Sequence, residues 1–160
     1  MELDTFYATV SGVGFTLLGL WWVVVDKHPE WFQEPTTALM AYVVSLQFIV
    51  PATSSLLSLV APDAPAVWRT VFVLLGLVGI AGAVLVAVTL AATQPGVSII
   101  ALILSLPVYL GIILVALVPG IGSGLDLTGL QLEAFLFAMV LVLGLHAVWF
   151  FSHQVMRPSA

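Results

Sequence analysis

Five residues between residues 40 and 58 have types and spacings that could do chemistry inside an apolar stretch. They are Gln47, Pro51, Ser54, Ser55 and Ser58. A helix would place them on one stripe, because their spacings follow its 3.6-residue repeat. Proline in a helix removes one main-chain hydrogen bond and frees the carbonyl one turn earlier, that of Gln47. A free carbonyl beside hydroxyl groups could bind water or a partly dehydrated cation.

This polar stripe has two interpretations. An amide or hydroxyl group in hydrocarbon is costly unless it is hydrogen-bonded, so the stripe could line a water-containing path. The same groups could instead hydrogen-bond to neighbouring helices, where each bond contributes about 0.6 kcal/mol, and only hold the helices together.

Two histidines near the C-terminus are candidates for proton transfer. His146 lies inside an apolar run, and His153 follows it two helical turns later on the same face. Imidazoles titrate near neutral pH, so the pair could relay protons. Alternatively, His146 stays neutral and hydrogen-bonds to a neighbouring helix.

Three carboxylates are expected at one end of the helices. Glu133 belongs to the first turn of the last apolar run, where the helix dipole favours a negative charge. With Asp63 and Asp126 it would form an acidic vestibule in an oligomer, and such rings concentrate cations at a pore mouth. The alternative is that Glu133 only caps its helix.

The composition requires these residues to be positioned by membrane-spanning helices. The chain has 160 residues, of which 62% are hydrophobic and 7% are charged, whereas soluble domains carry roughly 25% charged residues. A spanning helix needs about 20 apolar residues, and five runs are long enough. They cover approximately residues 5–25, 36–60, 66–92, 97–118 and 129–151. We therefore predict an all-α, polytopic transmembrane bundle of five spanning helices, forming a single transmembrane domain over residues 1–160.

Small residues recur along one face of the third run. They are Gly76, Gly79, Ala83 and Ala87. Small side chains let two helices approach closely in lipid, so this ridge is expected to pack against another helix.

Several classes of function are disfavoured. The net charge of −5 argues against nucleic-acid binding, which needs a basic surface. Without cysteine the chain has no thiol chemistry, and its three histidines lack metal-ligand spacing. We find no catalytic motif and predict no enzyme activity, no metal and no cofactor.

Five spans place the two termini on opposite sides of the membrane. Lys27 and Arg157, two of the three basic residues, belong to the side that holds the C-terminus. The positive-inside rule then predicts a cytoplasmic C-terminus and an outside N-terminus, in a plasma or inner membrane.

Three functions fit these patterns. Five helices enclose little space, so the leading hypothesis is a homo-oligomeric channel for inorganic cations, with the polar stripe lining a pore between copies. The first alternative is a non-catalytic accessory or assembly subunit, whose small-residue ridge docks on a larger membrane complex. The second is a small transporter or proton path that uses His146.

Overall fold

The computed structural model describes residues 3–60, 63–118 and 120–155, and gives only the main chain for residues 125, 154 and 155. Its long helices are α1 (Leu3–Asp26), α2 (Pro35–Val60), α3 (Pro65–Ala91), α4 (Pro95–Leu117) and α5 (Gly129–Val155). Two short 3₁₀ helices, η1 (Pro29–Phe32) and η2 (Ser123–Leu125), lie in the connections. All five long helices are long and apolar enough to cross a membrane. The predicted fold class is therefore confirmed.

The helix boundaries follow from the residues at their starts. Proline is the first residue of α2, α3 and α4. Its fixed φ angle suits the first turn, and it lacks an N–H group that would have no partner there. Thr128 caps α5 differently: its Oγ1 accepts from the Gln131 N–H at 3.2 Å, and the Gln131 Oε1 accepts from the Thr128 N–H at 2.8 Å. This reciprocal pair is a capping box.

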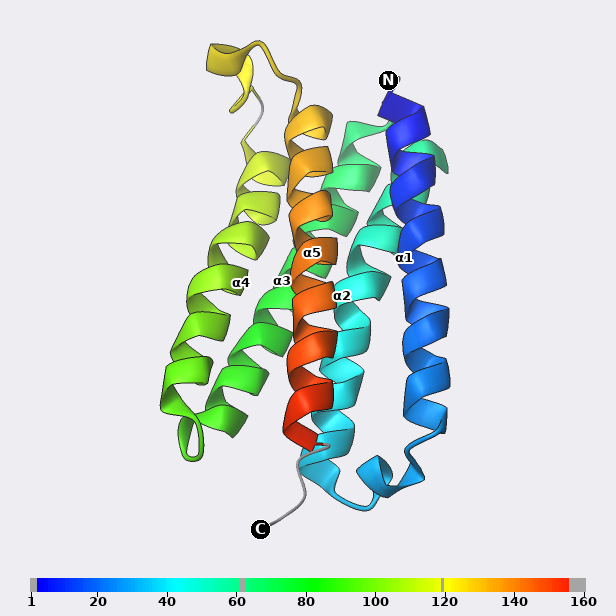
Figure 1. Ribbon diagram of the computed structural model, residues 1–160. Coiled ribbons are helices and arrows are strands. Elements are labelled where there is room, and N and C mark those ends of the chain that lie inside the picture. The colour runs from blue at the N-terminus through cyan, green and yellow to red at the C-terminus, as the bar shows by residue number, and fades with distance from the viewer. Residues whose placement is uncertain (1–2, 61–62, 119, 156–160) are drawn as a thin grey trace.

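Helix α2 lies at the centre of the bundle, with α1, α3 and α5 against it (Figure 1). In its apolar segment 61% of the residues are buried, against 33% or less in the other four helices. We call the end of the bundle that holds the starts of α1 and α5 the N-terminal end, and the opposite end the C-terminal end (Figure 1). Any polar group on the inner faces of α2 is consequently enclosed by protein.

The small-residue ridge of α3 packs against α4. A Cβ atom added at Gly76 would lie 2.7 Å from Ile113 Cγ1, and one added at Gly79 would overlap the ring of Tyr109. Ala83 and Ala87 are also buried. The ridge is thus covered within the subunit, so it is not free to receive a larger partner.

Replacing Gly79 with valine will destabilise the protein, because the new side chain occupies the space of the buried Tyr109 ring. Overpacking of this kind costs about 1–3 kcal/mol. The free energy of unfolding can be measured by denaturant titration in mixed micelles. Gly19→Val is the matched control, since nothing lies within 4 Å of a Cβ atom at that position. Equal stability of the two variants would contradict the packing.

Aromatic side chains tie α1, α2 and α5 together at the C-terminal end. The indole N–H of Trp21 donates to the Ala41 carbonyl at 3.1 Å, and the ring of Trp21 lies 5.6 Å from that of Phe151. Trp31 of η1 packs on the same ring at 4.8 Å. These contacts pack the end of α1, together with η1, against α2 and α5.

Candidate functional site

Glu133 is a fully buried carboxylate in the second turn of α5. Its exposed fraction is 0%, and neither carboxylate oxygen has a hydrogen-bond partner in the described part of the chain. Asp63 and Asp126 are exposed in the connections. The three carboxylates therefore do not share an exposed surface of the subunit, because α5 turns Glu133 inward.

Aromatic rings surround this carboxylate. On α1 the hydroxyl of Tyr7 donates to the Leu130 carbonyl at 2.7 Å, and Tyr7 is close enough to Glu133 to interact with its charge. Phe137, one turn after Glu133, has its ring 6.3 Å from that of Tyr7 and 5.1 Å from that of Phe72 on α3. Tyr7, Phe72 and Phe137 thus form an aromatic cluster on the side of α5 that holds Glu133.

The basic residue at this end of the bundle does not neutralise Glu133. Arg69 on α3 has a buried Nε atom without a hydrogen-bond partner, and no ion pair joins it to Glu133 among the described residues. Removing an unpaired carboxylate from water costs several kcal/mol. The carboxyl group is therefore stable in this position only when it holds a proton or a cation.

Two hydroxyl groups of α2 are also buried without partners. Ser54 and Ser55 are 0% exposed, and neither Oγ atom has a hydrogen-bond partner in the described chain. Serines in helices usually donate to the carbonyl four residues earlier, as Ser58 does to Ser54 at 2.8 Å. Ser54 and Ser55 do not, so both hydroxyls are available to water, a proton or a cation.

The register of α2 and α5 puts Glu133 at the depth of Ser58, with Ser54 and Ser55 about 4–6 Å closer to the middle of the bundle. The helices touch where a Cβ atom added at Gly144 would lie 2.9 Å from Gln47 Cβ. Glu133 lies eleven residues before Gly144, and Ser58 lies eleven residues after Gln47. At 1.5 Å per residue, and because the helices are antiparallel, both lie about 16 Å from this contact, toward the N-terminal end.

Gln47 is held at the centre of the bundle by a residue that the sequence analysis missed. The hydroxyl of Tyr109 on α4 donates to the Gln47 Oε1 atom at 2.7 Å. Tyr109 is 0% and Gln47 8% exposed. With Pro51 and the three serines also buried, the whole polar stripe faces the inside of one subunit. The stripe is therefore buried within one subunit.

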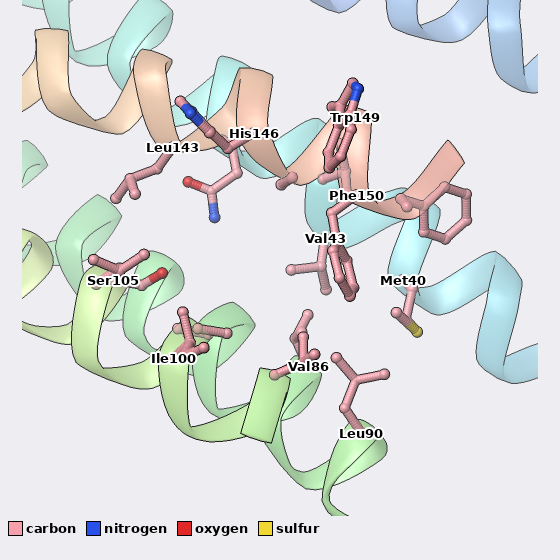
Figure 2. A pocket seen from close by; sticks show the side chains of 18 residues that line it. Met40, Val43, Val86, Leu90, Ile100, Ser105, Leu143, His146, Trp149 and Phe150 are labelled. Carbon is pink, nitrogen blue, oxygen red and sulfur yellow. The ribbon is translucent and has the colours of Figure 1, made fainter. Parts of the chain in front are cut away.

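A cavity of about 360 Å³ continues from Gln47 toward the C-terminal end. It lies between α2, α3, α4 and α5, and Figure 2 shows His146 of α5 and Ser105 of α4 among its lining side chains.

His146 is exposed, and its Nδ1–H donates to the Val142 carbonyl at 2.8 Å. His153 donates likewise to Trp149 at 3.1 Å, and its ring lies 4.3 Å from that of Trp149. Both imidazoles therefore keep Nε2 for another partner.

The ligand set of the buried site suits a monovalent species. Among the described residues no three His, Asp or Glu side chains come together as a metal site would require. Glu133 offers one negative charge, and the unpartnered hydroxyls of Ser54 and Ser55 offer neutral oxygens in the same half of the bundle. That combination fits a proton or a monovalent cation better than a divalent metal, which takes several oxygen ligands.

The five apolar helices and the composition define the chain as a multi-pass integral membrane protein. Comparison with protein-family models, curated proteins and solved structures found no match to this chain.

Proposed function

We propose that the protein conducts protons, or a small monovalent cation, across the membrane along a path inside each subunit. The path begins at Glu133 near the N-terminal end, passes the hydroxyls of Ser54 and Ser55, and reaches the amide of Gln47. From Gln47 it continues along α5, past His146, toward the C-terminal end. Gln47, Ser54 and Ser55 are buried on α2, and Glu133 and His146 belong to α5.

The observation that carries this proposal is the burial of Glu133 without a partner. An ionisable group inside a membrane protein is expensive, and its usual role is in a proton or ion pathway. A carboxylate kept only for stability would have a partner, since an apolar side chain of similar size would avoid the desolvation cost. The unpartnered hydroxyls of Ser54 and Ser55 support the proposal, because they extend the polar site toward Gln47.

The sequence favoured a pore shared between copies of the chain. We propose instead that the polar stripe lines a path within each subunit. The stripe is buried against α1, α3 and α5 of its own chain, and this packing favours a path inside each subunit. In a homo-oligomer each copy would carry its own path. The flux per subunit would then be independent of the number of subunits in the assembly.

Proteoliposomes holding a pH-sensitive dye test the proposal. A potassium gradient with valinomycin sets the membrane potential, and we expect the interior to acidify faster than in protein-free vesicles when the interior is negative. Replacing external sodium with choline separates protons from a monovalent cation: proton flux persists, whereas cation flux is lost. Acidification and sodium uptake that both equal the protein-free rate would overturn the proposal.

A further inference from the structure

The cavity between α4 and α5 opens toward the bilayer. Near the N-terminal end the two helices touch, since a Cβ atom added at Gly111 would lie 3.2 Å from Leu136 Cδ2. Toward the C-terminal end α4 and α5 diverge (Figure 1). Side chains of both helices line the cavity in this half of the bundle. Leu104 of α4 and Trp149 of α5 line it and are 52% and 63% exposed. Because both helices are apolar spanning segments, a molecule dissolved in the lipid can enter here.

Three polar side chains of this cavity lie at nearly one depth. They are Gln47, Ser105 and His146. His146 is two residues from Gly144, which touches Gln47, and Ser105 is one turn before Tyr109, which bonds to Gln47. All three therefore lie within about one helical turn, roughly 5 Å, along the membrane normal. The other lining side chains are apolar.

Each of these three side chains keeps free hydrogen-bonding capacity. The Gln47 Oε1 atom is bonded to Tyr109, which leaves the amide NH₂ group as a donor without a partner among the described residues. The Ser105 hydroxyl likewise has no partner there, and His146 uses only Nδ1. The set thus offers donors from Gln47 and Ser105 and an acceptor from His146 Nε2.

The chemistry of the lining selects a neutral head group. No acidic or basic side chain other than His146 lines the cavity. A phosphate or carboxylate head would lose its hydration without an opposite charge nearby, which is unfavourable. A carbonyl or hydroxyl head would instead satisfy the free donors and the free acceptor. The volume of about 360 Å³ is near the lower end of ligand pockets, ~300–1,000 Å³, so it suits a compact head.

We propose that this cavity binds a neutral, lipid-soluble molecule whose compact head carries carbonyl or hydroxyl groups. The head would lie among Gln47, Ser105 and His146, and the apolar tail would leave between Leu104 and Trp149 into the lipid. A quinone and a diacylglycerol are two sources of this chemistry. The proposal does not depend on proton conduction, because binding requires only the cavity and its free polar groups.

Tryptophan fluorescence in nanodiscs can test the binding. A benzoquinone with a short alkyl chain quenches indole fluorescence on contact, so we expect saturable quenching that is lost in Trp149→Phe. Trp22→Phe is the matched control: Trp22 is also exposed, at 57%, but does not line the cavity. That control should keep the saturable component and lose only quenching that rises linearly with quinone dissolved in the lipid.

Two lining variants locate the site. Ala101→Phe fills the cavity, and it should weaken binding about tenfold or more. Ile103→Phe, which adds a ring at an exposed position outside the lining, should leave binding unchanged. Ser105→Ala keeps the fold with less disturbance and should also weaken binding.

The outcomes separate the sources of the ligand. Saturable quenching by the quinone supports the site. If unlabelled diacylglycerol displaces the quinone, the cavity binds both head groups. Displacement of a fluorescent diacylglycerol without any quinone effect supports a glycerolipid ligand. If neither probe saturates, or if Ala101→Phe behaves as the wild type does, the proposal is overturned. Loss of proton flux with intact binding would instead affect only the proposed function.

Discussion

Replacing Glu133 with glutamine will reduce proton or cation flux about 100-fold or more, the scale on which a positioned proton-transfer group contributes. Glutamine keeps the size of the side chain but cannot hold an exchangeable acidic proton or balance a cation. The protein should remain as stable as the wild type, because the carboxylate that is removed has no hydrogen bond to lose in the described chain. Flux is measured in proteoliposomes and stability by thermal unfolding in detergent.

The control for this experiment is Glu34→Gln, which neutralises an exposed carboxylate before α2. It removes the same charge from the chain, so it reports any effect of net charge alone and should keep the wild-type flux. If Glu133→Gln conducts as fast as Glu34→Gln does, Glu133 has no part in conduction. If Glu133→Gln instead unfolds much more easily than the wild type, the carboxylate has a structural role.

Replacing Gln47 with leucine will reduce the same flux about tenfold or more, since it removes the amide between the serine end of the path and His146. Its partner gives an independent measurement. Tyr109→Phe leaves the buried Gln47 Oε1 atom without a donor and should cost about 1–3 kcal/mol of stability. The double variant should cost less than the sum of the two single changes, because both remove the same hydrogen bond.

The control for the tyrosine is Tyr42→Phe. Tyr42 is also on a spanning helix, α2, but it is 56% exposed and its hydroxyl makes no hydrogen bond among the described residues. Its loss should change neither stability nor flux. Additive effects of Gln47→Leu and Tyr109→Phe on the free energy of unfolding would show that the bond between them does not exist in the membrane.

The five helices could be predicted because lipid imposes a simple requirement on sequence. Each spanning segment must be apolar over about 20 residues, and prolines or charged residues occur where a segment ends. The predicted run at 36–60 corresponds to α2, which begins at Pro35, and the run at 129–151 corresponds to α5, which extends to Val155. Helical periodicity also indicated that Gln47 and Ser58 share a face.

The neighbours of each face could not be predicted in the same way. Periodicity does not say which helix covers a polar stripe, so Tyr109 on α4 was missed as the partner of Gln47. Glu133 was expected to cap its helix or to line a vestibule, because it lies close to the start of an apolar run. The rings that pack on the same side of α5, those of Tyr7 and Phe72, come from two other helices that are distant in the sequence.

Hydrogen–deuterium exchange followed by infrared spectroscopy would test most directly whether water-borne protons reach the carboxyl group inside the bundle. In reconstituted membranes at neutral pH, the wild type should show the C=O stretch of a protonated carboxylic acid, and this band should be missing in Glu133→Gln. We expect this band to shift within minutes of transfer to D₂O, because water-borne deuterons exchange with the carboxyl proton. A band that keeps its position for hours would mean that Glu133 is sealed from both sides of the membrane, and that result would contradict the account.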